Sequence, residues 1–308
     1  MTRRPAALLL ALALGTAVYA AAPADGSWVG EPVRQCATST RWVHVPAGTV
    51  LMGEDGPGRP GKPVHVPEFW IGDHEVTNGE FARFIAATGY VTQAEREGGS
   101  ALFSPPLSGQ DIGGPISWWR FARGADWQHP QGPGSDITGR SWLPVVHVTF
   151  EDARAFAAWQ ASELPDAVQW ERAARADQTG PRDPLDWAYD RASGSAPIAN
   201  TWQGVFPAVD TGQDHFRGIA PVGCFPPNNL GIHDMIGNVW EWTTSSAGSD
   251  DGIRRLLKGG SYLCALNYCA NFRAAAFQAQ DHDLGASHIG FRTIRTTRPG
   301  NASPENPS

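Results

Sequence analysis

Two closely spaced cysteines are the residues of this chain best suited to chemistry. Cys264 and Cys269 lie five positions apart, directly after the turn sequence Gly259-Gly260-Ser261, in a chain with only four cysteines. A close thiol pair can form an exchangeable disulfide or hold a soft metal ion such as Cu(I). Zinc would need four ligands, and no Cys-x-x-Cys or His-x-x-x-His set lies nearby in the sequence to supply them. The residues therefore favour Cu(I) over zinc, with a structural disulfide as the alternative.

The other two cysteines, Cys36 and Cys224, bear on the compartment. Arg3-Arg4 precede an apolar run over positions 6–22, which is the charged, apolar, small-residue order of a secretory signal peptide. We predict a signal peptide over residues 1–22, with an uncleaved membrane anchor as the alternative. The folded domain is then exported, whether periplasmic, secreted or anchored on the outer side of a membrane, and no stable membrane partner is expected after cleavage. A disulfide between Cys36 and Cys224 can persist there, although sequence alone does not bring them together.

The composition favours one large domain with many irregular turns. Among 308 residues there are 35 glycines, 25 prolines and 13 tryptophans, so many turns are braced by large rings. The formal net charge is -7 and the basic residues are scattered, which argues against a nucleic-acid partner. We expect residues 23–39 to form an N-terminal extension and residues 40–296 to form the domain. The polar, proline-rich residues 297–308 are expected to be a disordered tail.

Short strands are predicted at both ends of the domain. Residues 42–53 alternate apolar and polar side chains as an edge strand would, and residues 64–66 and 69–71 are expected beside it. The region from Asn200 to Arg292 is predicted to be loop rich in glycine and aromatic residues. Brief strands are expected within it at residues 255–257 and 290–293.

Three helices have recognisable starts. Thr77-Asn78-Gly79-Glu80 is a capping box, followed by Phe81, Phe84 and Ile85 on one face and closed by Gly89. A second helix is expected from near Thr149, with Phe156 and Trp159 on its buried side, and a third from Asp166, with Trp170 turned inward. Few helices on short strands predict an α+β domain with low regular content.

Several further motifs occur in a fixed order over about residues 40–295. They are Pro46-Ala47-Gly48 with Met52-Gly53, Glu75-Val76-Thr77-Asn78, Phe81 and Phe84, Pro144-Val145-Val146-His147-Val148, Leu164-Pro165 with Trp170-Glu171, Gly237-Asn238-Val239-Trp240-Glu241-Trp242, Gly259-Gly260-Ser261 and Gly290-Phe291-Arg292. Together they resemble the formylglycine-generating enzyme, or sulfatase-modifying factor, family. The resemblance implies a variant of the C-type lectin fold with little regular secondary structure, which agrees with the α+β class.

The resemblance also assigns roles around the cysteine pair. Ser261, Cys264, Tyr268, Cys269 and Arg273 match the active-site serine, first cysteine, tyrosine, second cysteine and arginine of the family, and Trp240 matches a tryptophan lining that site. It implies that Cys264 and Cys269 hold Cu(I), which takes a substrate cysteine as a third sulfur ligand and activates O2. Hydrogen leaves the substrate Cβ, and hydrolysis of the resulting thioaldehyde gives Cα-formylglycine. Ser261 and Tyr268 would be hydrogen-bond partners, Trp240 would exclude water, and Arg273 would orient the site or offset thiolate charge.

Two further groups match calcium sites of the family. Asn200, Thr201, Asp214 and Phe216 match one site, and Asp234, Gly237, Val239 and Glu241 match the other. Carboxylate or amide oxygens combined with backbone carbonyls suit Ca2+, which takes six to eight oxygens. The alternative is that these acids only cap turns.

The sequence departs from the family pattern beside the cysteines. Asn271 and Phe277 stand at positions where the family usually has arginine, and Ala265 stands where several members carry histidine. These changes leave the choice of substrate open, although family substrates are sulfatase-like polypeptides with a Cys-x-Pro-x-Arg signature. Two alternatives remain: a copper oxidase acting on another thiol, and a calcium-stabilised, non-catalytic binding module on the same scaffold.

Overall fold

The computed structural model describes residues 36–37, 39–53, 61–105, 118–178, 182–248 and 252–299. The predicted signal peptide, most of the N-terminal extension and residues 300–308 of the tail lie outside these ranges.

Helix starts in this protein are set by local capping chemistry. Helix α1 (Asn78–Thr88) begins with the predicted capping box at Thr77 and ends at Gly89, whose φ of 65° is left-handed. Helices α3 (Phe150–Trp159) and α4 (Ala167–Arg175) begin after Thr149 and Asp166, as predicted.

Two features of the helices differ from the prediction. A short helix, α2 (Gln93–Glu97), was not predicted, although Thr92 and Glu95 form the same kind of capping box. Trp159 is 41% exposed rather than buried, because it is the last residue of α3, although its ring still packs against Phe84 and Phe156. Among the described residues no helix is both long and apolar enough to cross a membrane.

The N-terminal strands form two small sheets. The predicted edge strand is two strands, β1 (Trp42–Val45) and β2 (Gly48–Met52), separated at Pro46-Ala47. Strand β1 pairs with β4 (Phe69–Gly72), which also pairs with β15 (Ile294–Arg295), whereas β2 pairs with β3 (Lys62–Val66). The expected neighbours of this region are therefore confirmed.

The central sheet lies in a region that the sequence suggested was mostly loop. Its order is β13 (Phe277–Asp281), β12 (Arg254–Lys258), β11 (Trp240–Ser246) and β14 (Ile289–Gly290). The predicted strand at 255–257 is confirmed as β12. The predicted strand at 290–293 is wrong: β14 and β15 lie on either side of Arg292, whose side chain is fully buried. The seven-residue β11 was missed because its first four residues are all buried and show no alternation.

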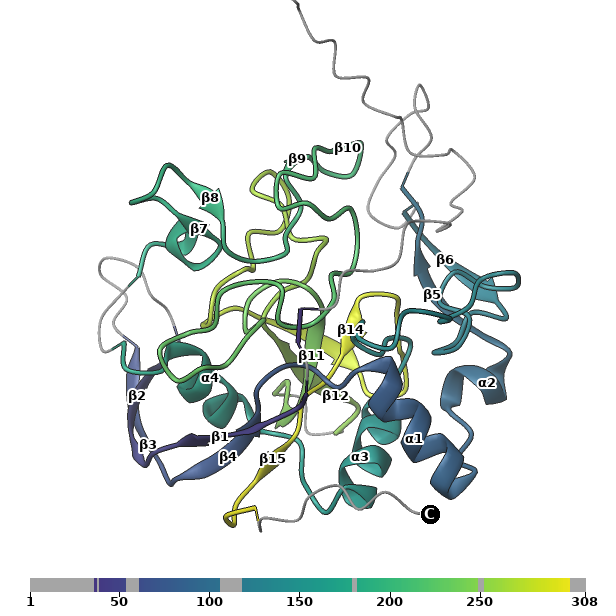
Figure 1. The fold of residues 1–308 in the computed structure, drawn as a ribbon, viewed down its shortest axis with the longest axis horizontal. Coiled ribbons are helices and arrows are strands. Elements are labelled where there is room, and N and C mark those ends of the chain that lie inside the picture. The colour runs from purple at the N-terminus through teal and green to yellow at the C-terminus, as the bar shows by residue number, and fades with distance from the viewer. Residues whose placement is uncertain are drawn as a thin grey trace, which may run out of the picture.

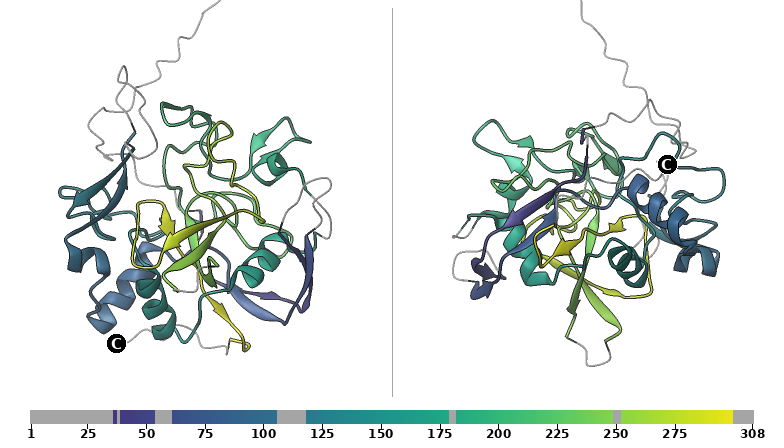
Figure 2. Two further views of the ribbon diagram at one scale, coloured as in Figure 1. Left: turned by 180° about the vertical axis from the view of Figure 1, so that it is seen from behind. Right: turned by 60° about the horizontal axis from the view of Figure 1, so that its bottom comes forward.

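Three further short strand pairs lie outside the central sheet. Strands β5 (Gly99–Phe103) and β6 (Trp119–Arg123) form one pair. A 3-10 turn at Pro184–Trp187 precedes β7 (Tyr189–Asp190), which pairs with β8 (Ala196–Pro197), while β9 (Gly204–Val205) pairs with β10 (Val209–Asp210). In Figure 1, α1, α3 and α4 lie in the lower part of the view and the pairs β7-β8 and β9-β10 at the top, and the view from behind in Figure 2 shows the same separation. The domain is α+β with short elements, as predicted.

A disulfide and a largely aromatic core hold these elements together. Cys36 and Cys224 are joined across 188 residues of sequence, so the pairing that sequence left open exists. The main core includes Phe81 and Phe156, whose rings stack, Trp170 and Trp240. Cys264 also belongs to this core. One of the two candidate catalytic thiols is therefore packed into the main hydrophobic core.

Candidate functional site

The loop between β12 and β13 carries both candidate catalytic cysteines. Gly259 and Gly260 open it with φ angles of 96° and 80°. A Cβ on Gly260 would lie 3.0 Å from Asn271 O and 3.3 Å from Cys264 Sγ. Both the left-handed backbone and the lack of space therefore require glycine here. The loop is fixed to its surroundings by Tyr262 N, which donates to Asn238 O at 2.9 Å.

The two thiols face each other without a disulfide. Their Sγ atoms are 3.7 Å apart, and both cysteines are free. Cys264 is 1% exposed, whereas Cys269 is only partly buried. Asn271 Nδ2 donates to Cys269 Sγ at 3.0 Å, and Ser261 N donates to Cys264 Sγ at 3.4 Å. The structure thus brings together a deep sulfur and an accessible one, and each accepts a hydrogen bond.

The two sulfurs differ in acidity. The hydrogen bond from Cys264 lowers the pKa of Cys269 to about 7, and Asn271 also lowers it. The same hydrogen bond, followed by burial, raises the pKa of Cys264 well above its usual value. One proton therefore leaves the pair near neutral pH, and the remaining proton stays on Cys264, which donates it to the Cys269 sulfur. Because metal binding needs thiolates, a soft cation would displace that second proton.

This asymmetry gives a testable pH dependence. The alkylation rate of the free pair by iodoacetamide should rise with pH through a midpoint of about 7, because only the Cys269 thiolate is both accessible and formed there. Asn271→Ala should move that midpoint upward by removing one donor to the sulfur. Mass spectrometry of the alkylated peptide would identify the modified cysteine. Modification mainly at Cys264 would contradict the assignment.

The other predicted catalytic residues are not equivalent in position. Ser261 is fully buried, and its Oγ accepts a hydrogen bond from Leu263 N at 3.3 Å. The Tyr268 ring is 49% exposed and stacks on Phe206 with ring centroids 4.7 Å apart. Trp240 is a core residue at 1% exposure. Arg273 is partly buried, and its Nε has no hydrogen-bond partner in the described structure.

An aromatic cluster that the sequence did not predict supports the outer side of the site. It contains Phe103, Trp118, Trp202, Phe206, Leu263 and Ala265. Trp118 meets the Tyr268 ring edge-on at 5.2 Å. Asn267, between the cysteines, is bonded in both directions to the backbone of Phe206, with its Oδ1 accepting from N and its Nδ2 donating to O, each at 3.2 Å. These contacts join distant parts of the sequence, so no local pattern predicts them. The family resemblance at residues 261–273 indicated only the loop against which the cluster packs.

The residues of the first predicted calcium site lie together. Asp214 accepts hydrogen bonds from Thr201 N at 3.2 Å and from Phe216 N at 2.9 Å, and Asn200 precedes Thr201. The Gln203 amide donates to both Thr201 O and Asp214 Oδ2, so a positive dipole lies between two predicted ligands. Burial raises the pKa of Asp214, and it raises that of nearby Asp210 to about 6. The carboxylates of Asp210 and Asp214 suit a hard cation, which would have to displace the Gln203 amide from Thr201 O and Asp214.

The residues of the second predicted calcium site surround an arginine. Glu241 accepts bonds from Arg292 Nε and Nη2, each at 2.7 Å, and from Trp170 Nε1 at 2.7 Å. Asp234 Oδ2 accepts from Gly223 N at 2.6 Å, and its backbone carbonyl accepts from Arg292. Gly237 and Val239 lie on the segment between these two acids. Glu241 is therefore already committed to an ion pair, which leaves Asp234 as the acid of this set that better fits a cation.

Glu75 is a buried acid of this cluster to which the sequence had assigned no role. Burial, followed by the charge of Asp234, raises the pKa of Glu75 well above its usual value. Its Oε1 accepts from Asn238 Nδ2 at 3.1 Å, but Oε2 has no partner in the described structure. Three acids thus lie near the single guanidinium of Arg292, and the raised pKa of Glu75 favours a proton on this acid. Among the described residues no three Cys, His, Asp or Glu side chains converge as a metal-binding set.

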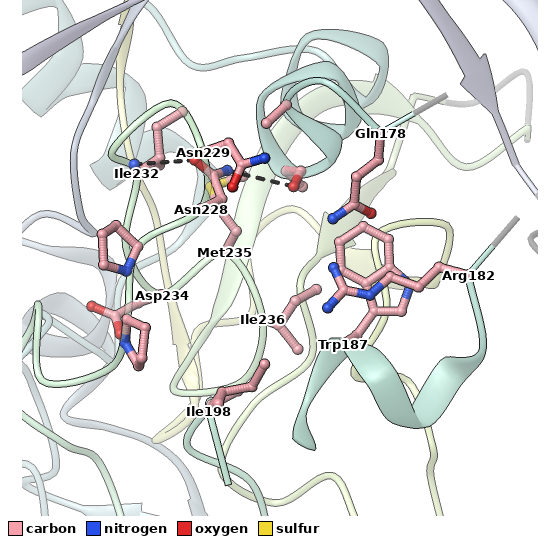
Figure 3. Close-up of a pocket in the computed structure, with 15 residues that line it drawn as sticks. Gln178, Arg182, Trp187, Ile198, Asn228, Asn229, Ile232, Asp234, Met235 and Ile236 are labelled. Atoms are coloured by element: carbon pink, nitrogen blue, oxygen red, sulfur yellow. Dashed lines mark hydrogen bonds between the residues drawn. The ribbon is translucent and has the colours of Figure 1, made fainter. Parts of the chain in front are cut away.

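A hollow of about 750 Å³, partly open to solvent, lies away from the cysteine loop. Figure 3 shows Arg182 and Trp187 on one side of it and Asp234 on the other, with Ile236 between them. The Arg182 guanidinium stacks on the Trp187 ring at 4.6 Å. None of its described lining residues belongs to the loop at 259–276, so it is separate from the thiol pair.

The fold and the site together define a class: an irregular α+β domain that presents a reduced thiol pair on one loop. The family described as sulfatase-modifying factor enzyme 1-like domain matches residues 29–297. The chain therefore belongs to the formylglycine-generating enzyme, or sulfatase-modifying factor, family, as the motifs indicated.

Relatives and solved structures agree with this membership. The chain is 41% identical over 280 residues to the formylglycine-generating enzyme of Thermomonospora curvata, covering 81% of this chain and 91% of that one. It is also 40% identical over 266 residues to the inactive C-alpha-formylglycine-generating enzyme 2 of Mus musculus, covering 81% and 84%. The solved structure of PvdO from Pseudomonas aeruginosa shares the fold, with a TM-score of 0.55 and 24% identity over 82% of this chain and 93% of that one. The relatives thus include proteins named as the enzyme and a protein named as inactive. Membership of the family alone therefore does not establish activity, and the residues of the site must be considered.

Proposed function

We propose that this chain is an exported, copper-dependent oxidase that uses O2 to convert a cysteine of a sulfatase-like polypeptide to Cα-formylglycine. The observation that supports it most is the free Cys264–Cys269 pair, with sulfur atoms 3.7 Å apart and one sulfur accessible. The relatives named formylglycine-generating enzyme supply the reaction class. A Cys-x-Pro-x-Arg segment is the proposed substrate signature.

The residues of the loop suit the proposed roles. Cys264 and Cys269 would hold Cu(I), because both sulfurs are free and one proton already leaves the pair near pH 7. Copper would supply the activation of O2 that side chains alone do not provide. Tyr268, half-exposed above Phe206, would contact the substrate chain. Arg273, whose Nε is unpaired within the described structure, would orient substrate or offset thiolate charge.

In the proposed reaction the substrate cysteine is oxidised by two electrons. One hydrogen leaves its Cβ and one leaves its thiol, and both pass to O2, which is reduced to the level of hydrogen peroxide while the substrate becomes a thioaldehyde. Water then replaces sulfur, so formylglycine and hydrogen sulfide are released. The buried Ser261 and Trp240 would keep bulk water away from the deeper sulfur.

A direct assay tests this proposal. Copper-loaded protein is incubated with O2 and a peptide containing Cys-x-Pro-x-Arg, and the aldehyde is trapped as a hydrazone and identified by mass spectrometry. A folded, copper-binding protein that yields no aldehyde would disprove the assignment to this substrate. Oxygen uptake with other thiols would then indicate the second oxidase hypothesis.

A non-catalytic binding module remains the second candidate, favoured by the inactive relative at 40% identity. The two candidates differ in their need for sulfur. A binding module should hold its ligand equally well after Cys264→Ser and Cys269→Ser, whereas the oxidase should lose its activity.

We also propose that Ca2+ binds at the cluster of Asn200, Thr201, Asp214 and Phe216, and at that of Asp234, Gly237, Val239 and Glu241. Calcium at about 100 times its Kd should raise the free energy of unfolding by about 2.7 kcal/mol per site, and EDTA should reverse the effect. Asp214→Asn should remove the part of this calcium-dependent stabilisation that comes from the first site. Asp190→Asn is the control and should leave the calcium response unchanged, because this half-buried acid at the end of β7 only caps the turn that follows. Thermal unfolding with and without calcium measures both, and an equal response in Asp214→Asn would contradict the first site.

A further inference from the structure

A second hollow, also of about 750 Å³ and partly open to solvent, lies beside the cysteine loop. Leu266, which lies between Cys264 and Cys269 in sequence, forms part of its lining, and so does Trp202. Trp202 is joined to the same loop, because its backbone N donates to Cys264 O at 3.0 Å. The hollow therefore adjoins the segment that holds both sulfurs.

The walls of this hollow are suited to an apolar occupant. Leu185, Tyr189, Trp202 and Leu266 supply large apolar surfaces. Leu266 is 58% exposed, so covering it would remove apolar surface from water. Ligand-binding hollows are lined mainly by hydrophobic and aromatic side chains with a few polar groups, as this one is.

The polar groups of the lining offer no free charge. Arg191 is the charged residue of the described lining, and it is paired with Asp183 at 3.3 Å and with Asp186. The Gln203 amide nitrogen is bonded to Asp214 and Thr201. A charged occupant would therefore find no unpaired countercharge in the described lining.

We propose that this hollow is a specificity subsite that receives an apolar side chain of the substrate polypeptide, from a residue near the cysteine to be oxidised. This inference rests on the proposed function, because it takes the thiol pair as the reaction centre. An extended polypeptide advances by about 3.3 Å per residue, so residues flanking a cysteine held at Cys269 reach the neighbouring surface. The occupant is a leucine-, isoleucine- or phenylalanine-sized side chain.

Peptides with a common Cys-x-Pro-x-Arg centre test the subsite when Leu, Gly or Asp is placed in turn at each flanking position. At one position the wild-type protein should convert the Leu peptide with a kcat/KM about tenfold or more above that of the Asp peptide. Leu266→Glu should lower kcat/KM for the Leu peptide to about that for the Gly peptide, because the carboxylate no longer covers an apolar side chain. Leu266→Asn should act in the same direction without a new charge.

Val209→Glu is the matched control. Val209 is also an exposed apolar residue, at 53%, and it lies on the hairpin β9-β10 near this loop but does not line the hollow. The Val209→Glu substitution should leave the preference for the Leu peptide unchanged. Equal kcat/KM for all three residues at every position, or equal effects of Leu266→Glu and Val209→Glu, would overturn the proposal.

Peptide binding separates this inference from the proposed function. Fluorescence anisotropy gives the Kd of the same labelled peptides whether or not they are converted. If no peptide is oxidised but Leu peptides bind more tightly than Gly peptides and Leu266→Glu abolishes the difference, the subsite stands and the oxidase assignment fails. If peptides are oxidised without such a difference, the oxidase assignment stands and the subsite fails.

Discussion

Copper(I) should bind in a one-to-one ratio to the native protein and be lost from the Cys264→Ser and Cys269→Ser variants. The sulfurs are free and 3.7 Å apart, so each variant removes one of only two soft donors in the loop. We expect the affinity for Cu(I) to fall by at least about 100-fold, because loss of a residue that only hydrogen-bonds a metal ligand already lowers metal affinity by up to about that factor. Formylglycine production should fall with it. Competition with a chromophoric Cu(I) chelator measures the affinity.

The second cysteine pair is the control for this experiment. Replacing both Cys36 and Cys224 by serine removes the disulfide and should lower the free energy of unfolding by about 2–5 kcal/mol. The ratio of bound copper at a temperature where the protein is folded should stay at one. A Cys269→Ser protein that still binds Cu(I) tightly and still oxidises the peptide would show that the thiol pair is not the metal site.

Removal of Arg292 should cause the largest loss of stability. Its guanidinium is fully buried and bonds to Glu241 and to the carbonyls of Gly72, His233 and Asp234. Arg292→Met would leave the carboxylates around it without a countercharge, so the free energy of unfolding should drop by about 3–5 kcal/mol. Urea unfolding monitored by tryptophan fluorescence gives this value directly.

A surface arginine provides the comparison. Arg254 is half-exposed and pairs with Asp281 at 2.9 Å, so Arg254→Met should cost only about 0–1 kcal/mol. If Arg292→Met proved as mild as Arg254→Met, the buried acids would have to be protonated in the native protein. In that case the stability of the Arg292→Met variant should rise as the pH falls, because its acids would take up protons on folding.

The parts of the fold with local causes were predictable from sequence. The starts of α1, α3 and α4 follow from capping boxes, in which all the interacting atoms lie within four residues. Strand β11 was not predictable in the same way, because a central strand covered on both faces loses its alternation. The exposure of Trp159 depends on where α3 ends relative to its neighbours, which local pattern does not specify.

The candidate site shows the same division. Motif spacing located the thiol pair, Ser261 and Tyr268, and the structure places them in one loop. It did not reveal that Phe206 supports Tyr268, or that Asn271 donates to Cys269 Sγ. The Phe206 contact joins positions about sixty residues apart, and the direction of the Asn271 side chain depends on the folded loop. Glu75 beside Arg292 is a similar case, because its environment arises only when distant segments pack.

The disulfide described above has a consequence for how this molecule matures. The chain holds two cysteine pairs in different oxidation states: Cys36 and Cys224 form a disulfide, whereas Cys264 and Cys269 are free thiols. Conditions that create the first bond also threaten the second pair, whose sulfurs are near enough to join after a small shift. A copper ion bound between Cys264 and Cys269 would prevent them from forming a disulfide. Early copper binding would therefore decide what fraction of the newly made protein can become active.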